Sequence, residues 1–494
     1  MATNIISADM LPQDGSLWLN TGGRPWPIST EFVYLICFWS AASAHSIEAL
    51  QLAQRLANTH SDKPIVVIGV HQPHFDPNLQ RTAALAALAL RGIRCAVVLD
   101  AEGELPQMFS ATQNGAIAII GPRHNLLGCL TASDPETLES FVLQAATITS
   151  TDPATKPRPV PEPQPHDADA PLVQPTRLLP DLVNRRILIA DTGNHRILVA
   201  TPTGVVTQQI GSGEPGLRDG GHGSAQFRLP QGMALAGNSL FVCDTGNHVI
   251  RCVSLVDNSV STVAGMGRPL QNGDKIAGAR TTPISSPWDI CYLAGSFYIA
   301  AASCNQIWRF RPGDETLRPV AGSGARGRDD GHAVAASFAQ PAGIATDGEC
   351  LYVIDSRSGC VRRVTIGVEC FVKTLAGGNV DDWGDRDGEG ASARFQNPQG
   401  IWCDEGQVLI ADTFNNRIKT LATQSGVVAN LAGDGLPGKL AGPAAEARFN
   451  QPIGVSAGGG KVWICDSGNG RIRVLDLLSR EVTTLRLDGI AASE

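Results

Sequence analysis

The sequence predicts an α/β domain at the N-terminus, followed by an all-β domain that forms a six-bladed β-propeller. Three observations lead to this prediction. Apolar runs alternate with helical patterns over the first 150 residues, a proline-rich stretch follows, and a motif then recurs at a nearly constant interval. The chain also contains 53 glycines and 31 prolines, which favours many short strands joined by tight turns. We therefore expect an α/β domain over 1–150, a linker over 151–177 and the propeller over 178–494.

The propeller prediction depends on the repeated motif Ala-x-Phe-x-x-Pro-x-Gly. Its large apolar position recurs at Phe227, Ile284, Phe338, Phe395 and Phe449, and the copy at Ile284 is decayed. Each copy is followed by four short apolar runs, which are separated by turns. Short strands repeated at a fixed period are typical of propeller blades, each of which buries its faces against its neighbours. The first blade has no clear Phe-x-x-Pro motif, and its first strand is expected near 178–183. The sequence does not decide how the ring closes.

A second marker in each repeat is an apolar run that ends in aspartate and a turn, and it predicts six blades. Aspartate before Thr/Ser-Gly-Asn suits an Asx turn, in which the carboxylate accepts N–H bonds two residues on. A structural role is therefore favoured over metal binding, since one blade has alanine instead. The six positions are Asp191, Asp244, Ala301, Asp355, Asp412 and Asp466.

The predicted linker, 151–177, contains eight prolines. Such spacing favours an extended, semi-rigid polyproline II chain and excludes a helix. Before it, strands are expected at 32–38, 65–70, 95–100 and 116–120, and helices near 41–58, 78–91 and 135–145. Strands that alternate with helices predict a mostly parallel sheet with helices on its faces.

The turns Asp-Thr-Gly-Asn-His at 191–195 and 244–248 carry a family resemblance. With Gly-x-Gly…Asp-Gly loops such as 211–220 and 322–331, they resemble NHL repeats, a family of propeller blades. The resemblance extends over residues 178–487 and implies a six-bladed NHL propeller.

The segment 38–45, Phe-Trp-Ser-Ala-Ala-Ser-Ala-His, resembles the active-site turn of thioredoxin-like domains, where an aromatic residue precedes Cys-x-x-Cys. Together with Trp18-Leu19-Asn20-Thr21 and the later strands, it makes the chain similar to a family that joins a thioredoxin-like domain to an NHL propeller. The resemblance implies that the family's two redox cysteines correspond to Ser40 and Ser43, and its cis-proline to Gly115.

Thiol–disulfide exchange needs a thiolate at a helix start and a resolving thiol within one turn. A serine hydroxyl supplies neither, so we expect no redox catalysis at Ser40 and Ser43. Cys37 lies inside a strand run, where a buried and unactivated thiol is expected. A serine nucleophile with His45 as its base is disfavoured. His45 is five residues from Ser40 and two from Ser43, and on one helix neither spacing brings the side chains together. Helix capping by the serines is the favoured interpretation.

The remaining polar candidates point to surface contacts. His195, His248 and Asn416 follow the Asp turns of three blades and are the candidate partner-binding residues, with turn-exposed side chains. Two histidines without a third ligand make a poor zinc site, and His71 with His74 has no visible partner. The acidic loop 381–389 lacks a correctly spaced bidentate glutamate and is expected to be a solvated turn. No metal and no cofactor are expected.

These observations favour a non-catalytic protein-interaction scaffold with a protein partner. The alternatives are an atypical thiol–disulfide oxidoreductase and a metal-dependent propeller hydrolase or lyase. Nucleic-acid binding is disfavoured, because the net charge is −8 and neither part of the chain has a basic excess. No signal peptide, membrane-spanning run or C-x-x-C pair is visible, so we expect a monomeric, cytoplasmic protein that does not enter a membrane.

Overall fold

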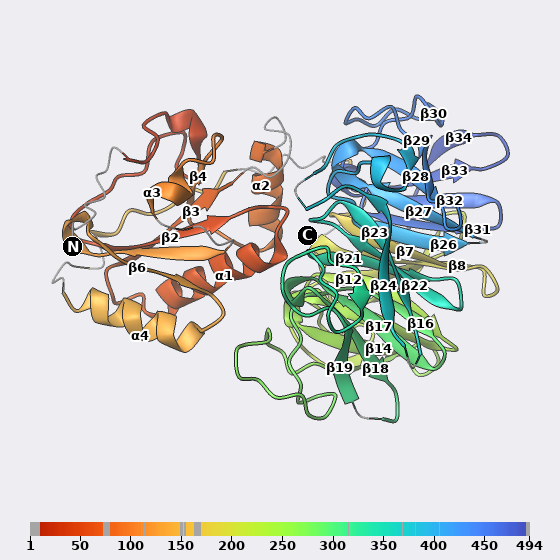
Figure 1. The fold of residues 1–494 in the computed structure, drawn as a ribbon, viewed down its shortest axis with the longest axis horizontal. Helices are drawn as coiled ribbons and strands as arrows, with labels where there is room; N and C mark the ends of the chain where they lie inside the picture. Colours follow the sequence, from red (N-terminus) through yellow and green to blue (C-terminus); the bar gives the residue numbers. More distant parts are fainter. Residues whose placement is uncertain are drawn as a thin grey trace. The chain divides into compact units, whose positions relative to one another are not determined.

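In a computed structural model, the chain divides into two compact units, Met1–His166 and Asp167–Glu494. The structure describes residues 10–72, 80–109, 111, 115–148, 152, 155–162, 169–314, 316–367, 369–380, 382–404 and 406–490. Figure 1 draws both units.

The N-terminal unit is built on a sheet with the strand order β1-β4-β3-β2-β5-β6. Only β2, β3 and β4 pair in parallel, whereas β1, β5 and β6 pair antiparallel. Three of the five strand pairings in the described sheet are antiparallel, so the prediction of a mostly parallel sheet was wrong. For β6 the reason is local: a short turn joins β5 to β6, with Gly121 N–H donating to Asn125 O at 2.9 Å, and so short a connection reverses the chain. The strands are β1 (Trp18–Leu19), β2 (Val33–Trp39), β3 (Ile65–His71), β4 (Ala96–Leu99), β5 (Ala116–Ile120) and β6 (Leu126–Thr131).

Two apolar clusters cover the two faces of this sheet. Alternate residues of β2 point to opposite faces, as strand geometry requires: Leu35 belongs to one cluster and Ile36 to the other. The first cluster holds the apolar sides of α1 (Ala44–Thr59), α2 (Gln80–Leu90) and α4 (Pro135–Ala146), and the second includes the start of α3 (Leu105–Met108). The predicted helices near 41–58, 78–91 and 135–145 are thus present.

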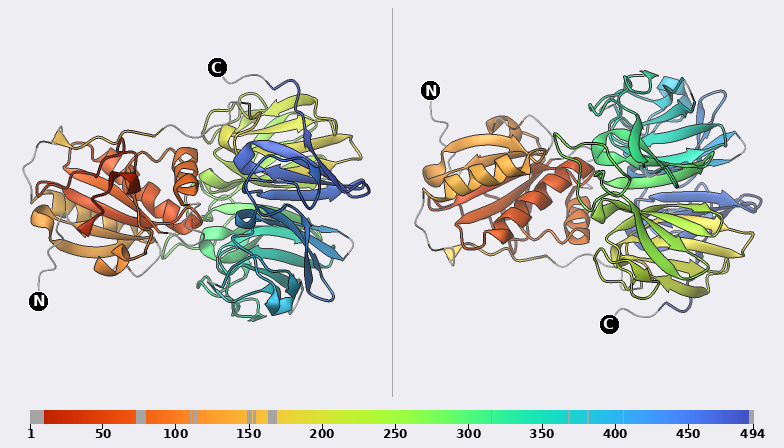
Figure 2. Two further views of the ribbon diagram at one scale, coloured as in Figure 1. Left: turned by 90° about the horizontal axis from the view of Figure 1, so that it is seen from above. Right: turned by 90° about the horizontal axis from the view of Figure 1, so that it is seen from below.

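In the described part of the C-terminal unit, six antiparallel sheets confirm the six-bladed propeller. Their innermost strands contact one another in turn, and Figure 2 shows the yellow first sheet beside the blue last one. Most blades gain a two-residue strand at the outer edge, contributed by the loop that leads into the blade. The four main strands, from the centre outwards, are β7 (Pro175–Asp181), β8 (Arg186–Asp191), β9 (Arg196–Ala200) and β10 (Val206–Ile210) in blade 1; β12 (Pro230–Ala236), β13 (Ser239–Asp244), β14 (Val249–Ser254) and β15 (Ser259–Ala264) in blade 2; β16 (Pro287–Leu293), β17 (Ser296–Ala301), β18 (Gln306–Arg311) and β19 (Thr316–Ala321) in blade 3; β21 (Pro341–Thr346), β22 (Cys350–Asp355), β23 (Cys360–Thr365) and β24 (Phe371–Gly377) in blade 4; β26 (Gly400–Asp404), β27 (Gln407–Asp412), β28 (Arg417–Ala422) and β29 (Val427–Ala432) in blade 5; and β31 (Gly454–Gly458), β32 (Lys461–Asp466), β33 (Arg471–Asp476) and β34 (Glu481–Leu485) in blade 6.

Blade 1 starts earlier than the predicted boundary at 178. Its strand β7 begins at Pro175, and Leu172 is fully buried in the propeller core. Val173 N–H donates to Asp191 Oδ1 at 2.9 Å, which is the bond that the residue after the motif phenylalanine makes in other blades. Leu172-x-x-Pro175 is therefore the missing motif, and leucine in place of phenylalanine concealed it. At the other end of the predicted linker, Val160 N–H donates to Asn20 O at 2.8 Å within the N-terminal unit.

The ring closes between the first and last blades. Ser467 Oγ donates to Pro175 O at 2.5 Å, just as Thr245 Oγ1 donates to Pro287 O at 2.6 Å between blades 2 and 3. A second connection joins the segment after β34 to the start of β10, where Val206 N–H donates to Asp488 O at 2.9 Å. Closure thus repeats an ordinary blade contact and adds a backbone pairing.

Candidate functional site

In the centre of the propeller, neighbouring blades approach one another closely at the glycine position of the repeated motif. In four blades this residue is Gly232, Gly343, Gly400 or Gly454. A Cβ at Gly400 would lie 1.9 Å from Ile453 O, and one at Gly232 would lie 2.4 Å from the Cα of Asp289. The backbones of neighbouring blades approach too closely there for any side chain.

In blades 1 and 3, the glycine of the motif is replaced by Arg177 and Asp289, and these two side chains form an ion pair. Arg177 Nε donates to Asp289 Oδ1 at 3.2 Å, Nη2 contacts Oδ2, and Nη1 donates to Ile401 O at 3.2 Å. The Asp289 carboxylate also accepts N–H bonds from Ile290 and Ile344, both at 2.9 Å. Burial lowers the pKa of Arg177 to about 10, so the guanidinium remains charged at neutral pH.

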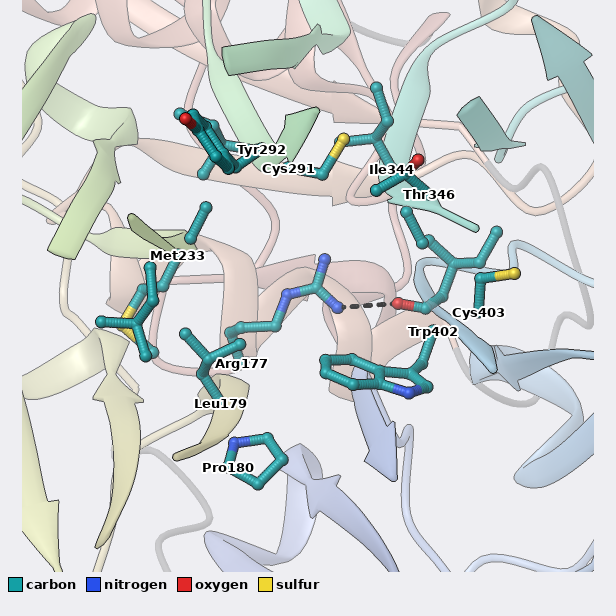
Figure 3. A pocket seen from close by; sticks show the side chains of 15 residues that line it. Arg177, Leu179, Pro180, Met233, Cys291, Tyr292, Ile344, Thr346, Trp402 and Cys403 are labelled. Carbon is teal, nitrogen blue, oxygen red and sulfur yellow. Dashed lines mark hydrogen bonds between the residues drawn. The ribbon is translucent and has the colours of Figure 1, made fainter. Parts of the chain in front are cut away.

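A cavity of about 290 Å³ lies beside this ion pair, within the propeller. Its walls are the residues that follow the glycine position on β7, β12, β16, β21 and β26, and Figure 3 shows the Arg177 guanidinium among them. The lining is mostly apolar. It consists of Arg177, Leu179, Pro180, Met233, Ala234, Leu235, Ile290, Cys291, Tyr292, Ile344, Ala345, Thr346, Ile401, Trp402 and Cys403.

The two thiols of the cavity are protonated. Burial raises the pKa of Cys291 far above its usual range and that of Cys403 to about 12. A protonated thiol is neither a good nucleophile nor a metal ligand. Among the described residues, no group of three or more His, Cys, Asp or Glu side chains could hold a metal ion.

Ser40 and Ser43, which the resemblance aligns with two redox cysteines, lie where β2 ends and α1 begins. Ser43 is the N-cap of α1, and its Oγ accepts from Ser46 N–H at 3.4 Å. Ser40 Oγ accepts from Ala42 N–H at 3.4 Å. Gly115, directly before β5, has φ +78° and faces the helix start, since a Cβ there would meet His45 at 3.2 Å. Both serines are buried and serve the backbone of the helix start, which is the capping role that the sequence favoured.

Cys37 lies on β2 near these serines, but its thiol is not activated. It is buried, and its burial, with a smaller effect of Cys95, raises its pKa well above the usual range. His71 Nε2 instead accepts from Ala41 N–H at 3.1 Å, and the His71 ring packs against Trp39 at 4.8 Å between centroids. His71 is thus part of the packing at the helix start, while His74 lies outside the described residues.

The three predicted partner-binding residues lie at blade junctions and are not turn-exposed. His195 Nδ1 accepts from Leu229 N–H of the next blade at 3.1 Å, and His248 Nδ1 accepts from Ser286 N–H at 3.1 Å. Asn416 Oδ1 accepts from Gln451 N–H at 2.9 Å. All three have left-handed backbone conformations, which the tight turn imposes. Each side chain therefore connects its blade to the next one.

The marker aspartates point into the blades. Asp244 Oδ1 accepts from Arg228 N–H at 2.7 Å, and its Oδ2 binds Asn247 Nδ2 and Arg251 Nη1. The predicted Asx-turn bond is replaced, because the carboxylate is completely buried and turned towards Arg251, whose guanidinium lies 4.9 Å from the centre of the Phe227 ring. Equivalent cations are Arg362, Lys419 and Arg473.

The acidic loop 381–389 supplies the same kind of contact, so the solvated-turn prediction was wrong for part of it. Asp385 and Asp387 bind the buried Lys419 Nζ at 2.6 and 3.0 Å. In blade 3, isoleucine, alanine and tryptophan replace the phenylalanine, aspartate and cation together, at Ile284, Ala301 and Trp308, and all three are buried. The cation is thus kept only where its carboxylate is present.

Sequence reasoning missed Arg177 and Asp289. A signal existed, since the decayed motif at 284–289 has aspartate at its glycine position. Its partner was hidden, because Arg177 lies in a motif that itself was not recognised.

In the described chain, the helices all lack the length and apolar character that crossing a membrane would need.

Comparisons with known proteins agree with the repeat architecture. The NHL repeat model matches residues 449–475. NHL repeat-containing protein 2 from Bos taurus is 33% identical over 95% of this chain and 70% of its own length, and the Homo sapiens protein is 32% identical over 96% and 70%. Protein SUPPRESSOR OF QUENCHING 1, chloroplastic, from Arabidopsis thaliana is 30% identical over 96% of this chain and 47% of its own length.

Among solved structures, a streptogramin B lyase aligns with a TM-score of 0.39 and 11% identity, over 65% of this chain and 85% of the lyase. A chain of a nidogen/laminin complex aligns with a TM-score of 0.40 and 16% identity, over 61% and 93%. With the six repeated sheets and the coverage of the two vertebrate relatives, the chain belongs to the NHL repeat-containing protein 2 family.

Proposed function

We propose that this protein is a non-catalytic interaction scaffold, in which a thioredoxin-like domain without redox chemistry is joined to an NHL propeller. The observation that carries the proposal is the environment of Ser40 and Ser43. They occupy the end of β2 and the start of α1, and their hydroxyls accept backbone N–H bonds of the helix start. No thiolate can form at either position.

The strand order supports the thioredoxin-like interpretation. The units β2–α1–β3 and β5–β6–α4 meet in the centre of one sheet, with β3 and β5 on either side of β2. Gly115 precedes β5 and faces the start of α1, where the resemblance implies a cis-proline. The cysteines nearest in the sequence to Ser40, Cys37 and Cys95, are both buried, with pKa values raised by that burial. Residual thiol chemistry is therefore disfavoured.

The propeller would provide the rigid binding platform. Because β14 begins where β15 ends in their pairing, the Asp turns and the loops that lead to the next blade share one face. These loops expose large apolar side chains, namely Leu217, Met266, Ile276, Leu436 and Leu440. His195, His248 and Asn416 lie at the base of this face, and in the proposal they hold the loops that contact a protein partner. A cytoplasmic location stays a prediction, as one relative is described as chloroplastic.

The binding half of the proposal is tested by affinity purification of the full chain. The variant Leu217→Ser/Leu436→Ser/Leu440→Ser should lose a protein partner that the unmodified chain retains. The control Val183→Ser/Leu478→Ser changes exposed apolar residues in turns of the opposite face and should keep it. Retention by the first variant, or loss by the control alone, would contradict this choice of face.

The catalytic half is tested by disulfide reduction of insulin with dithiothreitol. The unmodified chain should show no turnover above the uncatalysed rate, whereas Ser40→Cys/Ser43→Cys should acquire activity if the fold is thioredoxin-like. Turnover by the unmodified chain that Cys37→Ala abolishes would overturn the proposal. Inactivity of a folded double-cysteine variant would count against the thioredoxin-like interpretation.

A further inference from the structure

We propose that the cavity at the centre of the propeller binds a small apolar molecule that carries a carbonyl or carboxylate oxygen. The cavity volume is about 290 Å³. An apolar cavity of about 150 Å³ takes one benzene molecule, so this one accommodates a ligand of about twice that size, such as a bicyclic aromatic compound. Met233, Ile344 and Trp402 supply apolar and aromatic walls, which favour such a ligand through the loss of hydrated surface.

The bottom of the cavity offers hydrogen-bond donors. A guanidinium has five N–H groups, and the described contacts of Arg177 use three of them, on Asp289 and Ile401. One N–H on Nη1 and one on Nη2 remain, on a side chain that is only 9% exposed. A buried donor without an acceptor is costly. A ligand oxygen that enters the cavity would relieve this cost.

The charge of the site selects the class of ligand. The carboxylate of Asp289 already accepts four bonds, and the cavity lining contains no Asp, Glu or His side chain. An incoming molecule therefore meets donors from Arg177 and no free anionic acceptor. This disfavours an organic cation as the occupant and favours a neutral carbonyl compound or a carboxylate.

The cavity is closed at one end and open at the other. The close approach of the glycine backbones and the Arg177–Asp289 pair fill the channel on one side. At the other end Tyr292 is 42% exposed, so the ligand can enter past it. The protonated thiols of Cys291 and Cys403 imply reversible binding without covalent attachment.

The test is a fluorescence titration of the full chain with three probes of one ring system: 2-naphthoate, 2-naphthamide and naphthalene. At least one oxygen-bearing probe should bind with one site per chain and about tenfold or more tightly than naphthalene, the gain expected for a hydrogen bond from a charged donor. The comparison of the acid with the amide tells whether a carboxylate or a neutral carbonyl is preferred. Absence of binding by all three probes overturns the proposal.

Two variants locate the binding site. Ala345→Phe places a ring in the cavity wall and should abolish probe binding, while Leu478→Phe, on an exposed turn, should leave it unchanged. Arg177→Gly/Asp289→Gly restores the glycine found in the other blades and should remove the advantage of the oxygen-bearing probes over naphthalene. Binding that persists in a folded Ala345→Phe chain overturns the proposal, and this variant decides it even if the double-glycine chain does not fold.

Discussion

Arg177 on β7 and Asp289 on β16 form a buried ion pair across the propeller ring, at the two positions where the repeated motif lacks its glycine. The side chains are 9% and 2% exposed. The other four blades have glycine at this motif position, because their backbones meet there. Arg177 and Asp289 are therefore the side chains that the motif contributes at this level of the ring. It also supplies the polar end of an otherwise apolar cavity.

Removal of one partner of this pair should destabilise the propeller. Asp289→Ala leaves a buried guanidinium without its counter-charge, and we expect a loss of about 3–5 kcal/mol in the free energy of unfolding. Arg177→Met/Asp289→Ala should recover much of this loss, because no unpaired charge remains. Urea unfolding followed by circular dichroism measures both. Equal losses in the single and double variants would show that the charge pairing is not the cause.

The stability of the propeller should depend on pH through His195. Burial, with a smaller effect of Arg228, lowers the pKa of His195 below its ordinary value of 6.5, and neutral Nδ1 accepts the N–H bond of Leu229. The stabilisation is therefore complete above about pH 6.5 and is lost as the pH falls through the folded-state pKa.

His195→Asn is the matched variant, since Asn305 and Asn416 accept the same bond in other blades. The melting temperatures of the two chains should be similar near pH 8, and the asparagine variant should melt higher near pH 5. A difference that does not change with pH would contradict this role of the imidazole.

The buried carboxylate of Asp244 should require the cation of Arg251. Arg251→Trp leaves Asp244 buried without its cation, and we expect a loss of about 3–5 kcal/mol. The triple change Phe227→Ile/Asp244→Ala/Arg251→Trp copies the combination found in blade 3 and should lose less. Arg486→Met, on a side chain that is 87% exposed, serves as the control, with an effect within about 0.5 kcal/mol. A triple variant less stable than Arg251→Trp would refute the idea that the three residues form one unit.

Ring closure should be sensitive to Gly204. A Cβ there would lie 1.9 Å from Arg486 O, in the backbone pairing that joins the chain end to blade 1. Gly237 also has a positive φ but has open space around it, so Gly237→Ala reports a conformational cost without a steric clash. Gly204→Ala should lower the melting temperature more than Gly237→Ala does. Similar effects would show that the closure pairing adds little stability.

Much of the architecture could be predicted because short sequence patterns specify the strands, helices and turns. The six marker turns gave the number of blades, and the alternation of strands and helices gave β2, α1, β3, α2, β4 and β5 close to their bounds. The two-residue strand β1 and the hairpin strand β6 were missed, since their runs are too short or too weakly apolar. The start of β7 was missed because Leu172 takes the place of phenylalanine.

The sequence by itself determined the repeat and the number of blades, because each of these is a recurring local pattern of residues. Only the tertiary structure decided which side chains meet. Arg177 and Asp289 are 112 residues apart, and His195 accepts an N–H bond from Leu229 of the next blade. Such contacts depend on how the ring closes and how near its backbones come, and no local period in the chain encodes either distance.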